Sequence, residues 1–205
     1  MTSDATFWDQ TAEKYAASPI KDQAAYEHTL VETKKHLRPG DRLLEIGCGT
    51  GATALLLADA VAHITATDIS ANMIKIGRGK AATQQVTNVD FVQATPADPK
   101  LAAQTFDAIT GFNILHLLPD LEGDLAALSE RLKPGGLLIS KTPCLADWKW
   151  RAIGRLAIPI MQFFGKAPYV SFLKGSDVEA HITAAGFEVI MADNHNAFSR
   201  FIVAK

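Results

Sequence analysis

The chain is poor in the features that mark several classes of protein. Its 205 residues include only two cysteines, Cys48 and Cys144, which make no disulfide framework. It has no uninterrupted apolar run of the roughly 20 residues that span a bilayer, and Met1–Gln10 lacks the basic segment and apolar stretch of a signal peptide. A net charge of −2 gives no bulk attraction to nucleic acid. These absences predict a cytoplasmic protein without a nucleic-acid partner.

The chain does have strand and helix signals that alternate, over a length that suits one globular domain of residues 1–205. Ser70 is a natural N-cap for one helix, and Leu121, Leu125, Leu128 and Leu132 have the spacing of a buried helical stripe. This alternation predicts a parallel sheet covered by helices on both faces. Strands are predicted at 41–46, 63–68, 89–92, 106–111 and 137–140, and helices at 50–60, 70–80 and 121–132.

The C-terminal part departs from this alternation. Ser176 and Glu179 have the spacing of a capping box that opens a helix, and Gly186 has the place of the residue that closes it. The strands predicted at 187–192 and 198–203 are joined by a link too short for a crossover, so they must pair antiparallel. The predicted fold is therefore α/β: a Rossmann-like three-layer sandwich with a seven-stranded, mostly parallel sheet and a C-terminal antiparallel hairpin.

A glycine-rich loop is the strongest functional signal. The strand that ends at Ile46 runs directly into Gly47–Gly51, in which every second residue is glycine. Glycine lets the backbone turn sharply and lets a ligand approach, and the helix that follows offers unpaired N–H groups and the positive end of its dipole. Ligands of parallel sheets bind outside the carboxyl ends of the strands, where this loop, Asp68, Thr95 and Asn113 all fall. The pattern predicts a site for a nucleotide-like cofactor.

The loop leaves two cofactors open. Gly47, Gly49 and Ala52 also satisfy the dinucleotide fingerprint, with Asp68 near the expected acidic position, so an NAD(P)-dependent oxidoreductase is one alternative. Four features favour another cofactor. Glu45 stands two residues before the first glycine, where a carboxylate could meet a charged cofactor tail; the motif is internal; no Tyr-x-x-x-Lys is present; and the chain ends in a hairpin.

Together these residues resemble the class I methyltransferases that use S-adenosylmethionine, especially the small-molecule, type 11-like branch. The resemblance covers residues 41–142 well and 176–205 more loosely. Four segments carry it: Leu44–Gly51 is similar to the family's first motif, Asp68–Ser70 with Met73 to the second, Phe106–Asp107 with Asn113 to the fourth-strand segment, and Leu132–Gly136 to the fifth.

The sequence departs from the family at one position. The family usually has an acidic residue just after the third strand, near the adenine amino group, whereas this chain has Gln93-Ala94-Thr95. A hydroxyl or the backbone could bond the adenine there, and Asp98 could substitute if the loop bends back.

The resemblance implies that S-adenosylmethionine is bound at this loop. Asp68 would accept the two ribose hydroxyls, although it could instead cap the following helix. Ile69 and Met73 would pack on the adenine, although both could be plain core residues. Tyr15 lies in a helical leader, 1–40, that would fold over the cofactor or pack on the sheet. The implied cofactor-binding residues are Tyr15, Glu45, Gly47, Cys48, Gly49, Gly51, Asp68, Ile69, Met73, Thr95, Pro96 and Asn113.

The implied chemistry asks little of side chains, because the sulfonium makes its methyl group electrophilic and the protein mainly aligns the acceptor. A hydroxyl acceptor would need a base, and His116, past the fourth strand, is the candidate catalytic residue; a structural surface role is the alternative. The other histidines have no metal-ligand spacing, so no metal site is expected.

Segment 144–175 is the candidate lid or substrate-recognition insertion. It is rich in apolar and aromatic residues, Trp148 and Trp150 among them, which can seat a basic helix at a membrane surface. The segment therefore predicts methyl transfer to a small-molecule acceptor that is apolar, lipid-like or anionic, with transient membrane contact. A cap helix packed on the sheet is one alternative, and a non-catalytic cofactor-binding module is another. The charged residues of segment 144–175 are five basic ones against one acid: Lys149, Arg151, Arg155, Lys166 and Lys174 against Asp147.

Overall fold

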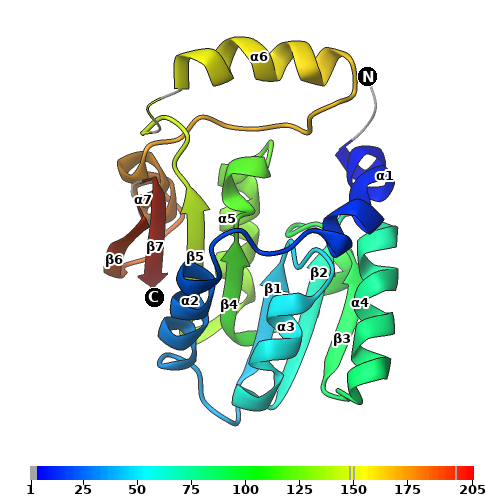
Figure 1. Cartoon of the computed structure of the whole chain (residues 1–205). Coiled ribbons are helices and arrows are strands. Elements are labelled where there is room, and N and C mark those ends of the chain that lie inside the picture. Colours follow the sequence, from blue (N-terminus) through cyan, green and yellow to red (C-terminus); the bar gives the residue numbers. More distant parts are fainter. Residues whose placement is uncertain (1–3, 148, 150, 197) are drawn as a thin grey trace.

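A seven-stranded sheet forms the centre of the computed structural model, which describes residues 4–147, 149, 151–196 and 198–205 (Figure 1). Its strands are β1 (Arg42–Ile46), β2 (His63–Asp68), β3 (Val89–Gln93), β4 (Phe106–Phe112), β5 (Leu132–Pro143), β6 (Val189–Asn196) and β7 (Ser199–Ala204). The strand order is β3-β2-β1-β4-β5-β7-β6. Strands β1 to β5 run parallel, and β7 pairs antiparallel with β5 and β6. The predicted fold class is confirmed.

Helices pack on both faces of this sheet, and one further helix lies across its carboxyl edge (Figure 1). They are α1 (Asp4–Ala17), α2 (Gln23–Lys34), α3 (Ala52–Leu57), α4 (Ala71–Gln84), α5 (Leu121–Arg131), α6 (Arg151–Phe163) and α7 (Gly175–Ala184), with 3-10 turns η1 (Ala58–Ala60), η2 (Pro99–Leu101) and η3 (Leu115–Leu117). Side chains of a strand alternate between faces, so the consecutive buried residues Leu43 and Leu44 enter different cores. Leu43 packs with α3 and α4, and Leu44 packs with α5 and α7.

The structure confirms some predicted helix ends and corrects others. The Ser70 hydroxyl accepts the Met73 N–H at 3.1 Å and so caps α4, as predicted, although α4 runs on to Gln84. The predicted helix at 50–60 is shorter, because α3 ends at Leu57 and a 3-10 turn follows. Leu132 was expected in the preceding helix, but it begins β5, where it pairs with Phe106 before an irregular register.

The capping box predicted at Ser176 and Glu179 is wrong. The N-cap of α7 is Lys174, two residues earlier than predicted, and its backbone N–H donates to Asp177 Oδ2 at 2.9 Å. Glu179 instead accepts a hydrogen bond from Arg200 Nε on β7 at 2.7 Å, so it ties the helix to the sheet. The predicted role of Gly186 is confirmed, because it follows α7 with φ +93°.

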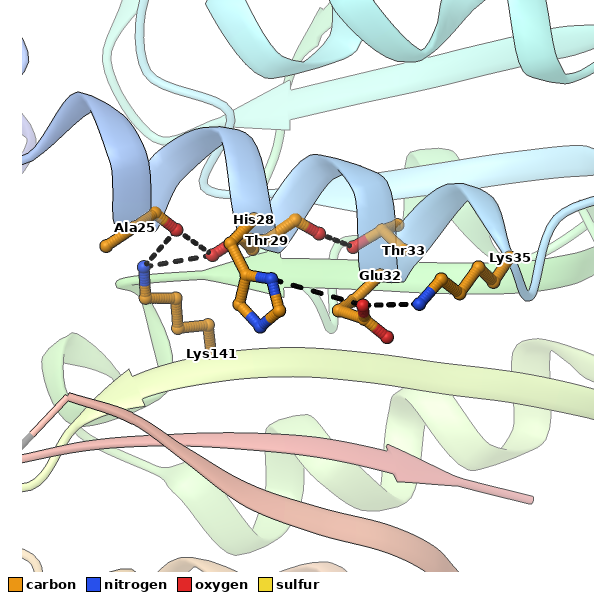
Figure 2. A network of polar contacts seen from close by, with 7 residues as sticks. All are labelled: Ala25, His28, Thr29, Glu32, Thr33, Lys35 and Lys141. Atoms are coloured by element: carbon orange, nitrogen blue, oxygen red, sulfur yellow. Dashed lines mark hydrogen bonds and ion pairs between the residues drawn. The ribbon is translucent and has the colours of Figure 1, made fainter.

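The leader is fixed to the sheet through α2 (Figure 2). Lys141 Nζ on β5 donates to the Thr29 hydroxyl at 3.0 Å and to the Ala25 carbonyl at 3.5 Å. The hydroxyls of Thr29 and Thr33 each bond the carbonyl four residues earlier, at 2.7 Å. Partial burial of Lys141 lowers its pKa. These contacts hold α2 beside β5, so that the chain before it, α1, reaches the other end of the carboxyl edge (Figure 1).

Candidate active site

A cavity lies at the carboxyl edge of the parallel strands, and most of the predicted cofactor residues meet in it. Its lining comes from α1, the β1–α3 loop, and the segments that follow β2, β3 and β4. The predicted residues in this lining are Tyr15, Gly47, Gly49, Asp68, Ile69, Met73, Thr95, Pro96 and Asn113. Glu45, Cys48 and Gly51 were also predicted but do not line the cavity. Trp8, Leu117, Leu118 and Asp124 line it without having been predicted.

The loop between β1 and α3 needs glycine because its backbone has left-handed φ angles at three positions. Gly47 has φ +61°, and a Cβ there would lie 2.5 Å from the Ile114 side chain. At Gly49, with φ +53°, a Cβ would lie 3.5 Å from the ring of Tyr15, which is therefore stacked close above the loop. Gly51 is needed for a different reason. A Cβ there would collide with Phe91, so the absence of a side chain lets Phe91 pack beneath the loop.

Asp68 is held rigidly at the end of β2. Its Oδ2 accepts the Gly49 N–H at 2.9 Å, and its Oδ1 accepts the Ser70 N–H at 2.9 Å. Each carboxylate oxygen keeps a second lone pair, so both can still accept hydrogen bonds from a ligand. Burial raises the pKa of Asp68, and the two N–H donors act against that rise. The cap of α4 is Ser70, which leaves the carboxylate of Asp68 facing the cavity.

Glu45 lies behind the loop as a buried carboxyl group, and no ion pair joins it to a basic side chain of the described residues. Its side chain is 3% exposed, and its Oε2 has no hydrogen-bond partner among the described residues. Burial, together with the nearby Asp68 carboxylate, raises the pKa of Glu45 to about 8. A buried acid of this kind favours a nearby positive charge, because a cation would stabilise its ionised form.

The leader closes one side of the cavity. Asp9 Oδ1 accepts hydrogen bonds from the Ser70 hydroxyl at 2.6 Å and from the Asn72 N–H at 3.0 Å, which fixes α1 to the start of α4. The rings of Trp8 and Tyr15 then meet edge to face at 6.4 Å. Partial burial, with the charges of Asp68 and Glu45, raises the pKa of Tyr15. Helix α1 of the leader therefore packs on α4, and its residues Trp8 and Tyr15 line the cavity.

Asn113 is placed by backbone strain just after β4. Its φ is +58°, a conformation that Asn tolerates better than most residues. Its N–H donates to the Lys141 carbonyl at 2.7 Å, which anchors the turn to β5. The turn brings Asn113 and the following Ile114 into the cavity wall.

His116, the predicted base, is not brought to the cavity, although Ile114 and Leu117 on either side of it line the wall. Its side chain is buried, and its Nδ1 has no hydrogen-bond partner within the described part of the chain. Burial lowers the pKa of His116 to about 4. The imidazole is therefore neutral near pH 7. Its backbone carbonyl accepts the Ser171 N–H at 2.7 Å, which joins η3 to the segment after α6.

The loop after β3 does not bend back as the sequence allowed. Asp98 caps η2 instead, with its Oδ1 accepting the Lys100 N–H at 2.9 Å, and it does not line the cavity. Thr95 and Pro96 do line it. Over residues 4–147, 149, 151–196 and 198–205, no three His, Cys, Asp or Glu side chains are grouped to hold a metal ion.

Residues 14–192 match a family model described as a methyltransferase domain. The chain belongs to this methyltransferase family. The resemblance to class I methyltransferases that the motifs predicted is thereby confirmed, and the glycine loop, Asp68 and Asn113 all lie within the matched range.

Two relatives and one solved structure extend this finding. A demethylmenaquinone methyltransferase of Listeria monocytogenes serotype 4a (strain HCC23) is 30% identical over 148 residues, which are 66% of the chain and 62% of that protein. A ubiquinone biosynthesis O-methyltransferase of Xanthomonas campestris pv. campestris (strain B100) is 30% identical over 158 residues, or 74% of the chain and 64% of that protein. The match thus spans less than two thirds of either relative. A DhpI–SAH complex shares the fold, with a TM-score of 0.75 at 18% identity over 98% of the chain and 94% of that protein.

Proposed function

We propose that this member of the methyltransferase family transfers a methyl group from S-adenosylmethionine to an apolar small-molecule acceptor. One observation carries the proposal: a fixed carboxylate, Asp68, lines the cavity at the glycine loop, and behind that loop lies a buried acid, Glu45, whose Oε2 has no hydrogen-bond partner among the described residues. The family match supports the activity. The names of the two relatives, from menaquinone and ubiquinone metabolism, support an apolar acceptor.

The residues in and behind the cavity suit the three parts of this cofactor: the ribose, the methionine tail and the adenine base. Asp68 has free lone pairs on both oxygens for the two ribose hydroxyls. The ammonium group of the methionine tail would favour the ionised form of Glu45, whose Oε2 has no partner among the described residues. Apolar side chains, including Ile69, Met73 and Leu118, line the cavity where a flat base would pack. When bound, S-adenosylmethionine supplies an electrophilic methyl group on a positively charged sulfur.

The residues of the chain would then promote the reaction by holding the cofactor and the acceptor in the right relative position. The glycine loop and Asp68 would fix one reactant, and Tyr15 of the leader, which lies close to Gly49, would contact it from the other side. Holding the acceptor in line with the departing sulfur can lower the barrier by roughly 7–11 kcal/mol. Because His116 lies behind the cavity wall with a pKa of about 4, a carbon, sulfur or amine nucleophile that needs no strong base suits this site best.

Ligand-dependent thermal denaturation tests the cofactor. S-adenosylhomocysteine at about 100 times its Kd should stabilise the fold by roughly 2.7 kcal/mol, and NAD at the same concentration should leave Tm unchanged. Stabilisation by NAD alone would establish the oxidoreductase alternative. A non-catalytic cofactor-binding module would be stabilised by S-adenosylhomocysteine yet give no methylated product with quinone, lipid and amine acceptors.

We further propose that acceptors reach the site along α6, which lies across the carboxyl edge of the sheet (Figure 1). Its apolar face points away from the protein, contrary to the packed-cap alternative, and only Gly154 is buried among its described residues. The exposed side chains recur every three or four residues, as one stripe of a helix does: Ile153 58%, Leu156 74%, Ile160 60% and Phe163 76% exposed.

The positive charge of α6 and its flanking residues favours an anionic bilayer surface as the partner of the exposed apolar stripe. Segment 144–175 has five basic residues and one acid, so its formal charge is +4 in a chain of net −2. Arg151 and Arg155 lie one turn apart, are both exposed, and line a polar hollow with Lys174 and Asp147. An apolar face with flanking cations is the pattern of helices that lie in the membrane interface. Trp148 and Trp150 fall outside the described residues.

None of the helices in the described ranges is long and apolar enough to cross a bilayer, so the proposed contact is with its surface. Flotation with vesicles that contain anionic lipid should recover the protein at low salt, and Leu156→Glu should abolish this recovery. Val31→Glu, a change of the same kind at a 55% exposed position on α2, is the matched control. Absence of flotation, or a concentration-dependent dimer that Leu156→Glu dissociates, would overturn the membrane contact.

We propose that residues 1–205 act as one unit in the cytoplasm, with leader 1–40 and lid 144–175 covering the site. Cys48 and Cys144 are both free and buried, which suits a reducing compartment. The net charge of −2 supports the absence of a nucleic-acid partner.

A further inference from the structure

A carboxylate that the sequence motifs do not mark enters the cofactor cavity from α5. Asp124 lies in the first turn of that helix and lines the cavity together with Thr95 and Pro96, the residues that follow β3. It is beside the backbone N–H of Ala97, the next residue of the same loop. Asp124 is thus adjacent in space to a loop that lies far from it in the sequence.

This adjacency is built into the core. Leu121 and Leu125, which flank Asp124 on α5, share one buried cluster with Ala94 at the end of β3. At the other end of the helix, Arg131 is buried and its Nη2 donates to the Asp98 carbonyl at 3.2 Å. Two separate contacts therefore hold α5 against the loop after β3, and the position of Asp124 follows from both.

The loop itself is short of groups for the edge of an adenine ring. That edge presents an amino group, which needs an acceptor, beside a ring nitrogen, which needs a donor. Thr95 offers one hydroxyl, Pro96 has no backbone N–H, and Asp98 is turned away to cap η2. The loop can therefore offer the amino group a hydroxyl or a backbone carbonyl, but a carboxylate acceptor has to come from another element.

We propose that Asp124 accepts the hydrogen bond of the adenine amino group and so selects an adenosyl cofactor. The proposal rests on the proposed function and deepens it, because it assigns the base-reading role to α5. Thr95 then serves the neighbouring ring nitrogen through its hydroxyl. Burial, and next the charge of Asp120, raise the pKa of Asp124 to about 6, as expected for a carboxylate partly removed from water and near a like charge. At pH 7.5 the group is ionised and able to accept.

Two ligands that differ only at this edge test the proposal. S-inosylhomocysteine has a carbonyl in place of the amino group of S-adenosylhomocysteine, and its ring nitrogen bears a hydrogen. Calorimetric titration of the full-length protein at pH 7.5 should show that the wild type prefers the adenosyl ligand by at least about tenfold, since a charge-assisted hydrogen bond is lost with the inosyl ligand. Asp124→Ala should bind the adenosyl ligand about tenfold more weakly and lose the preference.

Three variants make the result specific. Glu122→Ala removes a carboxylate from the same turn of α5, outside the cavity lining, and should keep the wild-type preference. Asp124→Asn retains an amide oxygen as acceptor and should keep part of it. Adding Thr95→Asp to Asp124→Ala returns an acid to the place where the family usually has one, and should restore discrimination.

The outcomes separate the two proposals. If the wild type binds the adenosyl ligand and folded Asp124→Ala binds it equally well, or loses affinity for both ligands by the same factor, the role of Asp124 is wrong and the proposed function stands. If the wild type binds neither ligand, both proposals are wrong.

Discussion

Among single side chains, Glu45 gives a prediction for both stability and binding, because its buried carboxyl group has no counter-charge among the described residues. Its pKa of about 8 lies above the ordinary value of 4.5, so between these values the folded protein keeps a proton that the unfolded chain releases. Folding stability from this group is therefore fully present below about pH 4.5 and is lost as pH rises through 8. We expect Glu45→Gln to flatten the fall in unfolding free energy over this range, measured by urea denaturation at a series of pH values.

The same variant should bind S-adenosylhomocysteine at least about tenfold more weakly, because it cannot offer a charge to the ammonium group. Methylthioadenosine lacks the ammonium tail and is the control ligand, since its affinity should not change. An equal loss for both ligands would contradict the assignment of Glu45 to the tail.

Asp68 has a structural and a binding role at once, and one substitution should reveal both. Asp68→Ala leaves the N–H groups of Gly49 and Ser70 without their acceptor, which should cost about 1–3 kcal/mol of unfolding free energy. It should also weaken S-adenosylhomocysteine by more than tenfold, by calorimetry below the new Tm. Asp90→Ala, at an exposed position on β3, is the control and should change neither quantity by much. Unchanged affinity in folded Asp68→Ala would exclude the ribose role.

Local sequence was sufficient to predict which residues lie in the cavity when those residues directly follow a parallel strand. Gly47, Gly49 and Asp68 line the cavity because a strand–loop–helix unit leaves little choice for them. Asp124 could not be found in this way, because its place depends on the packing of α5 against a loop some thirty residues earlier in the sequence. His116 was misleading for the same reason: sequence gives its place after β4 but not that its ring turns into the core.

Among the elements, α1 is the one whose attachment can be tested separately from the fold. Asp9 holds it by accepting hydrogen bonds from Asn72 and Ser70, and these bonds, the Asn72 N–H first, lower the pKa of Asp9. Asp9→Ala should speed hydrogen exchange of α1 amides and weaken cofactor binding severalfold, with global Tm nearly unchanged. Glu13→Ala, on the exposed side of α1, is the control. A large fall in Tm would show that α1 is part of the folding core instead.

Element boundaries were less predictable than element types. The alternation of strands and helices was read correctly because both faces of the sheet are buried. The capping box at Ser176 was wrong because Asp177 accepts the backbone N–H of Lys174, which places the N-cap two residues before Ser176. The end of α5 was wrong because Leu132 can continue an apolar stripe or begin a buried strand, and the pairing with Phe106 decides it.

At the scale of the whole molecule, the cavity lies at the carboxyl edge of the sheet, and two segments with different attachments, the leader 1–40 and the lid 144–175, lie beside that edge. The leader is pinned by side-chain hydrogen bonds from Asp9 and Lys141, whereas α6 presents its apolar stripe to solvent. The sequence predicted a lid or substrate-recognition insertion at 144–175, with a cap helix packed on the sheet as the alternative, but an amphipathic pattern alone does not say which face of a helix turns outward. Asp4 joins the two coverings, since its Oδ1 accepts the Tyr169 N–H at 2.9 Å.

A crystal structure of the protein grown with S-adenosylhomocysteine is the most direct test of the account. We predict the ribose hydroxyls on Asp68, the ammonium group close to Glu45 and the adenine amino group within hydrogen-bond distance of Asp124. Density for the ligand anywhere other than this cavity, or a cavity filled by protein side chains in crystals saturated with the ligand, would contradict it.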